Sequence, residues 1–182
     1  MILTGKEIHK RLGTDIIIEP FNINQLNPNS YNLRLDDEIF VVGHNIFLDN
    51  SEGIIDLKSS QAFWKENKEP DGSYILRPNK LYLARTVEYT ETFNLVPMIE
   101  GRSSIGRCGL FVHITAGFGD TGFKGCWTLE LVTTYPIKIY PNMEICQIYY
   151  HTIMGEVDNY KDDAKYNNNS GVQPSMIYKE FK

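Results

Sequence analysis

Apolar and polar residues alternate along most of the chain with the two-residue period of a β-strand. Short runs that contain Gly, Pro or Asn separate the alternating stretches, and this mixture favours short strands joined by turns. We expect strands at residues 16–18, 31–42, 73–76, 81–89, 96–100, 110–116, 125–132, 137–140 and 144–154. Strands at this spacing predict a mostly β fold of the sandwich or barrel type.

One segment near the start has the pattern of a helix. Thr4 and Glu7 have the spacing of a capping box. Ile8 and Leu12 then fall on one helical face, and Gly13 provides a stop. We therefore expect a short N-terminal helix of about two turns that covers one end of the sheet.

Two regions have no clear period. Residues 65–72 are polar and end in Pro70, Asp71 and Gly72, which predicts a loop. Residues 60–64 before them are compatible with one helical turn or with an aromatic anchor under that loop. By composition alone, residues 159–182 predict a disordered polar tail.

The length of 182 residues predicts a single domain over residues 1–182, with 159–182 as its tail. The net charge is −5, so we expect no binding to duplex nucleic acid or to anionic lipid, and a polyanionic ligand would need a few local cations. Apolar runs are too short to span a membrane, and the start shows no secretory signal, so we expect a cytoplasmic protein.

The three cysteines stand singly at Cys108, Cys126 and Cys146. Their odd number and the absence of CxxC spacing argue against a disulfide framework and against a zinc site. We interpret them as small buried apolar residues.

Residues 117–122 match the GxGxxG pattern of dinucleotide-binding proteins. A helix must follow that pattern, whereas residues 123–132 are aromatic and β-branched and predict a strand. We therefore interpret the glycines as a tight hairpin that lets the backbone approach a ligand.

Two arginines flank two serines directly after one of the expected strands. The segment reads Glu100, Gly101, Arg102, Ser103, Ser104, Ile105, Gly106, Arg107. Guanidinium groups, hydroxyls and the backbone N–H groups at a helix start can together hold phosphate oxygens. From the residues alone, a surface turn with a serine cap is an equally good interpretation.

Glu130 is a second candidate, in the expected strand 125–132. Strand alternation places it on one face with Thr128 and Val132, opposite to the apolar residues. A carboxylate in such a strand usually faces water, but a desolvated one can serve as a general acid or base. The residues alone do not decide between the two.

Several motifs together resemble the dCTP deaminase family, whose relatives are the trimeric dUTPases. They are residues 102–107 (RSSIGR), 113–120 (HITAGFGD) and 128–130 (TLE), with an opening similar at 1–3, 18–21 and 30–35 and a closing segment similar at 165–166 and 171–175. The resemblance covers nearly the whole chain. It implies a dUTPase-like distorted jelly roll or β-barrel with a short N-terminal helix, and it turns residues 159–182 into a flexible lid that orders on binding.

The resemblance also implies roles for single residues. Glu130 matches the glutamate that moves protons between an attacking water and the cytosine amino group. Ser103 and Arg107 match residues that hold this water and the charge developing at the ring. Asp120 matches a carboxylate beside the sugar that, in dUTPases, orients a water toward the α-phosphorus. Further positions that match nucleotide contacts are Arg102, Ser104, Ile105, Gly106, Thr115, Ala116, Thr128, Leu129, Gln147, Tyr160, Lys165 and Asn169.

Two positions depart from the family pattern, and two others point to one branch of the family. Asn169 replaces a family glutamine, which puts its phosphate contact in doubt, and Gly119 replaces an isoleucine, which we expect to loosen the turn that holds Asp120. Gly106 and Gly117 are similar to the dUMP-forming branch of the family, and their small size leaves room for a second water near the α-phosphate.

The implied reaction is a metal-independent deamination of cytosine. Zinc deaminases carry H-x-E and P-C-x-x-C, and neither signature occurs here. We interpret the four scattered histidines as packing or surface residues: His9, His44, His113 and His151. The resemblance implies Mg²⁺ bound through the triphosphate of the nucleotide, no zinc, and a homotrimer with sites between subunits.

Other functions remain open at this stage. The reaction could stop at dUTP, or the chain could be a dUTP diphosphatase. The chain could also be a binding module that senses dUTP or dCTP. Such a module has no need of the proton shuttle formed by Glu130, Ser103 and Arg107, so these residues disfavour it. A purely structural sandwich would make the residues at 102–107 and Glu130 a coincidence.

Overall fold

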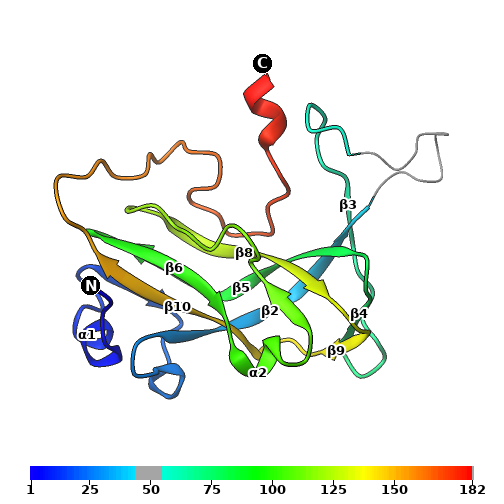
Figure 1. Ribbon diagram of the computed structural model, residues 1–182, viewed down its shortest axis with the longest axis horizontal. Helices are drawn as coiled ribbons and strands as arrows, with labels where there is room; N and C mark the ends of the chain where they lie inside the picture. Colours follow the sequence, from blue (N-terminus) through cyan, green and yellow to red (C-terminus); the bar gives the residue numbers. More distant parts are fainter. Residues whose placement is uncertain (44–54, 182) are drawn as a thin grey trace.

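A computed structural model describes residues 1–43 and 55–181, and it is mostly β (Figure 1). Residues 44–54 and Lys182 lie outside the described residues, and with them His44 and the start of the region around residue 50. The elements are α1 Gly5–Lys10, β1 Ile16–Glu19, the 3-10 helix η1 Ile23–Gln25, β2 Tyr31–Val42, β3 Phe63–Lys65, β4 Tyr74–Leu76, β5 Leu81–Thr92, β6 Leu95–Gly101, α2 Ser103–Gly106, β7 Leu110–Val112, β8 Lys124–Thr133, β9 Ile137–Ile139, β10 Glu144–Thr152 and the 3-10 helix η2 Ile177–Phe181.

Eight strands form one antiparallel sheet that curls into a nearly closed barrel (Figure 1). The order is β6-β10-β2-β5-β8-β7, with β1 paired to β5 and β3 paired to β2. The first and last strands of this order, β6 and β7, contact each other. A separate two-stranded sheet joins β4 to β9. This confirms the predicted barrel-like β fold.

The core lies inside the barrel and follows the predicted alternation. The inward residues of β2, β8 and β10 are buried, including Leu33, Leu35, Leu129, Leu131 and Ile148. Their outward neighbours along each strand are more exposed. Burial of these alternate side chains stabilises the sheet and at the same time fixes which side chains can reach a ligand.

The N-terminal helix forms as expected, although with six residues it is slightly shorter. The backbone N–H of Glu7 donates to the Thr4 hydroxyl over 3.3 Å, so Thr4 is the N-cap. The Glu7 carboxylate pairs with Arg11 at 2.8 Å, so the box is only half formed. Gly13 has the left-handed φ of 79° expected of a stop.

Two local expectations are corrected. Residues 60–64 form neither a helical turn nor a simple anchor, because Trp64 pairs with Val41 and makes β3 an edge strand beside β2. The strand expected at 110–116 ends at Val112, and His113 has a φ of 52°. Both outcomes depend on pairing partners that are distant in the sequence.

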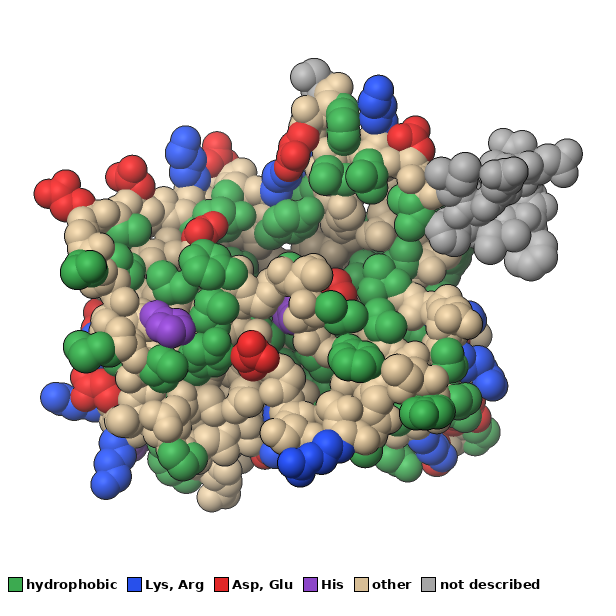
Figure 2. All heavy atoms as spheres, viewed as in Figure 1, with side chains coloured by type: hydrophobic (Ala, Val, Ile, Leu, Met, Phe, Trp, Pro, Cys, Tyr) green, Lys and Arg blue, Asp and Glu red, His purple; other side chains and the backbone are tan. Residues whose placement is uncertain are grey.

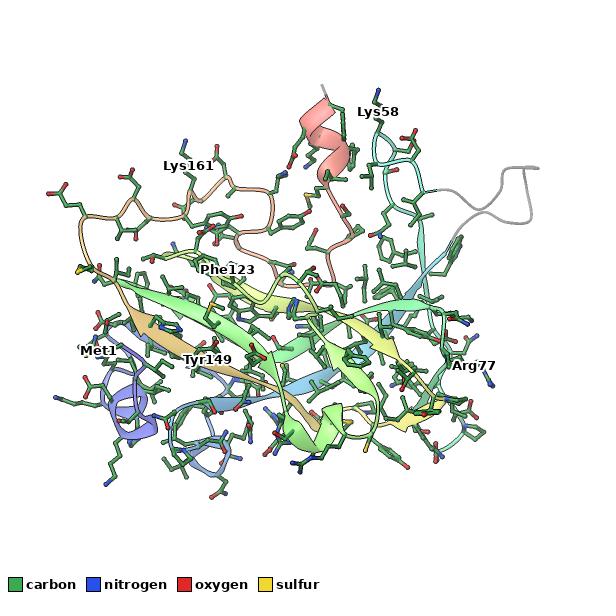
Figure 3. The ribbon with its side chains drawn as sticks, in the orientation of Figure 1. Met1, Lys58, Arg77, Phe123, Tyr149 and Lys161 are labelled. Carbon is green, nitrogen blue, oxygen red and sulfur yellow. The ribbon has the colours of Figure 1, made fainter. Side chains whose placement is uncertain are left out.

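The residues expected to form a polar tail pack against the same chain, above β8 (Figure 1). Asn168 donates its N–H to Lys124 O and Cys126 donates to Asn169 O, both over 2.8 Å. The first half of β8 is paired with β5 on its other side, so the tail extends the sheet at a free edge. η2 then lies beside residues 55–61, where Lys58 stands 5.8 Å from the centre of the Phe181 ring (Figure 3).

Candidate active site

A cavity of about 460 Å³ lies between β8 and the C-terminal segment, on the hollowed face seen in Figure 2. We call it the β8 cavity. In Figure 3, Phe123 lies below the segment that carries Lys161. Its lining includes Gln61, Leu81, Leu83, His113, Ala116, Phe118, Gly119, Asp120, Phe123, Cys126, Trp127, Thr128, Glu130, Tyr160, Tyr166, Asn169, Gln173, Pro174 and Ser175.

Glu130 reaches this cavity because of the alternation along β8. Its neighbour Leu129 is fully buried in the core, whereas Thr128 and Glu130 are partly exposed and line the cavity. The predicted face of Glu130 is therefore confirmed. The Leu129 side chain points into the core, and the nucleotide contact that the resemblance assigned to Leu129 stays a prediction.

The Glu130 carboxylate is paired with a histidine. His113 Nδ1 lies 2.5 Å from Glu130 Oε2, and only 4 % of the His113 side chain is exposed. An ionised carboxylate only accepts hydrogen bonds, so in that state Nδ1 carries the proton, and in the protonated state the carboxyl group donates to Nδ1. The pair therefore holds one proton in either of two places.

The fold fixes His113 from several sides. Its backbone N–H donates to Glu130 O over 3.3 Å, and its ring meets Trp127 edge-on with centroids 6.5 Å apart. Its φ lies in the left-handed region, which a residue with a Cβ adopts at a cost of about 1 kcal/mol or more. Its Nε2 is buried and has no hydrogen-bond partner within residues 1–43 and 55–181.

The predicted hairpin carries Asp120 to the cavity rim. No helix follows residues 117–122, which confirms that the GxGxxG match is not a dinucleotide site. Gly119 donates its N–H to Pro97 O over 2.9 Å, and a Cβ there would stand 2.4 Å from Trp127 Cη2. The turn is therefore tightly packed, and our expectation that Gly119 loosens it is wrong.

The tail closes the cavity through Thr128. The Thr128 hydroxyl accepts from Gln173 N at 3.1 Å and from Asn169 Nδ2 at 3.4 Å. Asn169 Oδ1 accepts in turn from Gly171 N and Gln173 Nε2. The hydrogen bonds described for the Asn169 amide thus hold the tail itself, and its predicted contact with phosphate stays a prediction.

Tyr160 comes to the same cavity from the start of the tail. Its N–H donates to Thr121 O over 2.6 Å, which places it beside the Asp120 hairpin. Burial, and then the nearby Asp120 carboxylate, raise the pKa of Tyr160, so the phenol keeps its proton at neutral pH. Lys165 does not line the cavity and pairs with Glu180 of η2.

The arginine and serine cluster lies elsewhere. Residues 102–107, which we call the α2 surface, form α2 and its caps between β6 and β7, and none of them lines the β8 cavity. Ser103, Ser104 and Arg107 are exposed. Gln147 belongs to this region, since its Nε2 donates to Gly101 O over 3.1 Å.

The structure thus divides the predicted site residues between two regions. The β8 cavity contains Ala116, Asp120, Thr128, Glu130, Tyr160 and Asn169. The α2 surface and its surroundings contain Arg102, Ser103, Ser104, Ile105, Gly106, Arg107 and Gln147. Thr115 is exposed, and it lines neither of the two cavities described.

Sequence reasoning missed the role of His113. We expected a packing residue, and it is indeed buried, but it also touches the carboxylate of Glu130. Gln173 and Gln61 were also missed as cavity residues. The predicted strand 110–116 placed His113 in mid-strand and gave no signal of this contact, because the contact depends on the register of β7 against β8.

Two kinds of feature are absent from residues 1–43 and 55–181. No group of three or more His, Cys, Asp and Glu side chains there has an arrangement that could hold a metal ion. Within the same residues, no helix has the length and apolar character needed to cross a membrane.

The chain is similar to known proteins over its whole length. It is 57 % identical over 187 residues to a protein of Hathewaya histolytica named "dCTP deaminase, dUMP-forming", with all of both chains covered. Proteins of the same name from Leptospira biflexa and Clostridium acetobutylicum are 56 % and 54 % identical, with 100 % of this chain and 99 % of each relative covered.

A solved structure and a family model agree with these relatives. The crystal structure of 2'-deoxycytidine 5'-triphosphate deaminase from Agrobacterium tumefaciens has the same fold, with a TM-score of 0.60 at 19 % identity, over 82 % of this chain and 47 % of that chain. The family model described as dCTP deaminase-like matches residues 2–153. The chain therefore belongs to the dCTP deaminase-like family.

Proposed function

We propose that this protein converts dCTP and two waters to dUMP, diphosphate and ammonia. The first water adds to C4 of cytosine, and the tetrahedral intermediate then releases ammonia to give uracil. The second water attacks the α-phosphorus, and diphosphate leaves. The name shared by the full-length relatives, "dCTP deaminase, dUMP-forming", supports this reading.

One observation carries the proposal: a carboxylate set in a partly apolar cavity and paired with a buried histidine. Glu130 accepts a proton from the first water and passes it to the departing amino group. His113 holds the Glu130 carboxylate in place and keeps one proton between the two groups. The aromatic rings of Phe123 and Trp127, tilted by 41° to each other, line the cavity and offer apolar contact for a pyrimidine.

Arg107 and Ser103 enter the site from a neighbouring subunit in this proposal. Both are exposed and lie outside the β8 cavity of their own chain. A homotrimer would bring the α2 surface of one subunit to the β8 cavity of the next. Arg107 then stabilises the charge developing at the ring, and Arg102 and Ser104 bind the phosphates.

Asp120 is the group proposed for the second step. It lies at the cavity rim beside Tyr160, where it can orient the water that attacks the α-phosphorus.

The two glycines that resemble the dUMP-forming branch, Gly106 and Gly117, differ in their surroundings. A Cβ on Gly106 would meet open space, whereas one on Gly117 would stand 2.3 Å from Ile99 O. Gly117 is therefore needed for packing against β6, and only Gly106 is free to act through its size.

Mg²⁺ belongs to the substrate in this scheme. A triphosphate binds Mg²⁺ through its own oxygens, and the magnesium complex of dCTP is the species that we propose to bind. The cations of the α2 surface then compensate the charge that remains on the phosphates.

A single assay tests the reaction. The protein is incubated with dCTP and Mg²⁺, and ammonia, dUTP, dUMP and diphosphate are quantified over time. Equal amounts of ammonia, dUMP and diphosphate are expected. Ammonia with dUTP would reduce the function to deamination alone. A second incubation supplies dUTP instead of dCTP. If dUMP forms there and no ammonia forms from dCTP, the protein is a diphosphatase. Tight binding with no product would contradict catalysis and leave a nucleotide sensor.

A further inference from the structure

Arg102 is held from behind by one residue of β10. Its Nη1 donates to the backbone carbonyl of Glu144 over 2.7 Å, and its Nη2 lies 3.0 Å from Glu144 Oε2. Two different oxygens of one residue therefore fix the plane of the guanidinium group. A guanidinium group has five N–H donors, so most of them remain for an anion on its other side.

Glu144 is fixed in its turn by the start of β2 and the residues just before it. Asn32 is only 5 % exposed, and its Nδ2 donates to Glu144 Oε2 over 2.7 Å. Asn27 Nδ2 donates to Asn32 Oδ1, also over 2.7 Å. Both ends of the Asn32 amide are thus occupied, which leaves its orientation no freedom.

Residues just before β2 also hold Gln147, another of the predicted nucleotide contacts. Ser30 donates its hydroxyl to Gln147 Oε1 over 2.7 Å, and Asn27 Nδ2 lies 3.2 Å from Ser30 Oγ. Arg102 and Gln147 therefore share one hydrogen-bonded support that runs through Asn27. Such support is what a preorganised anion site requires, because a long side chain loses rotamer entropy when it binds.

A carboxylate next to a phosphate-binding arginine has an electrostatic cost. Its negative charge repels the same phosphates that Arg102 attracts. A benefit of Glu144 to binding must therefore come from the hydrogen bonds that orient Arg102, and not from its charge. Substitution of Glu144 by glutamine separates the hydrogen bonds from the charge, because glutamine keeps an accepting oxygen and carries no charge.

We propose that Glu144 is a positioning residue for triphosphate binding, which acts by holding the Arg102 guanidinium group and is itself held by Asn32. The inference rests on the proposed function, because it takes Arg102 as a phosphate contact. It adds a role for Glu144 and Asn32, which touch no substrate in this scheme.

The test is a cycle of variants measured by ammonia release from dCTP. Glu144→Ala should raise KM about tenfold, with kcat changed less than about twofold, because binding and not chemistry is affected. Glu144→Gln should keep KM within about threefold of wild type, since its oxygen still accepts from Arg102 and Asn32. Arg102→Ala should raise KM about tenfold to a hundredfold. The double variant should resemble Arg102→Ala alone, because Glu144 acts only through Arg102.

Each outcome separates this inference from the proposed function. If KM is unchanged in Arg102→Ala, the phosphate role of Arg102 in the proposed function fails. If Arg102→Ala raises KM but Glu144→Ala does not, or if the two effects multiply in the double variant, the positioning role of Glu144 fails alone. A purely structural role would lower thermal stability in Glu144→Ala and would not spare Glu144→Gln in KM. The Glu144 side chain is 33 % exposed, so these variants should fold.

Discussion

The β8 cavity and the α2 surface differ in how their polar side chains are satisfied. In the cavity, Glu130 is paired with His113, and Thr128 accepts hydrogen bonds from the tail. On the α2 surface, Ser103 and Arg107 are exposed, and no side-chain hydrogen bond or ion pair joins either of them to another described residue. The cavity is complete within one chain, whereas the α2 surface presents groups outward.

This difference indicates a division of labour. The carboxylate that would move protons is held by a buried histidine of its own chain, which suits a group whose geometry must be exact to a fraction of an ångström. On the α2 surface, by contrast, Arg107 is exposed, whereas Arg102 is held by Glu144. In the proposed function, a single chain carries two halves of a site on separate surfaces, and a homotrimer would join them.

The largest effect is expected from Glu130→Gln. The amide keeps the shape of the side chain but cannot accept a proton, so kcat for ammonia release should fall by about a thousandfold or more. Binding of dCTP, measured by calorimetry, should change less than about threefold. Glu38→Gln removes a carboxylate from β2 outside the cavity and should behave as wild type. Turnover near the wild-type rate in Glu130→Gln would remove Glu130 from its role.

A smaller loss is expected from His113→Ala. Without the imidazole, Glu130 loses the partner that holds its carboxylate, so kcat should fall about tenfold to a hundredfold with a modest change in KM. The control is His9→Ala, since His9 is exposed and stacks on Phe21, away from the cavity. Equal and small effects of the two variants would show that the His113 contact has no part in catalysis.

The smallest effect is expected from a pair of glycine variants, one in each region. In Gly119→Ala, the new Cβ must displace Trp127 or Pro97, which should lower the free energy of unfolding by about 1–3 kcal/mol. In Gly106→Ala, the Cβ meets open space, so stability should change by less than about 0.5 kcal/mol. Urea unfolding followed by circular dichroism measures both. A destabilised Gly106→Ala or an unaffected Gly119→Ala would contradict the packing described for the two regions.

Local patterns were sufficient to predict what each strand does by itself. The alternation of Thr128, Leu129 and Glu130 correctly placed Leu129 on the face opposite to Glu130, but it did not decide whether Glu130 meets water or a cavity. The cap at Thr4 correctly marked the start of the first helix, which ends at Lys10, before the expected stop at Gly13. These features depend on neighbours within a few residues, which is why the sequence contains them.

Features that depend on distant pairing were not predictable in this way. The strand at Phe63–Lys65 exists because of β2, and the contact of His113 with Glu130 exists because of the register between β7 and β8. The separation of Glu130 from Arg107 is likewise a property of the barrel and not of their spacing. Family resemblance supplied the list of site residues, but only the fold divides them into two groups.

Mixing two inactive variants tests the central claim most directly, namely that one site takes Glu130 from one subunit and Arg107 from the next. Glu130→Gln and Arg107→Ala are each purified, combined in equal amounts, exchanged between subunits, and assayed for ammonia release, with native mass spectrometry to verify hybrid trimers. A random mixture has an intact pair at about one quarter of its sites, so about a quarter of the wild-type activity should return. Hybrid trimers with no more activity than the separate variants would contradict a site shared between subunits.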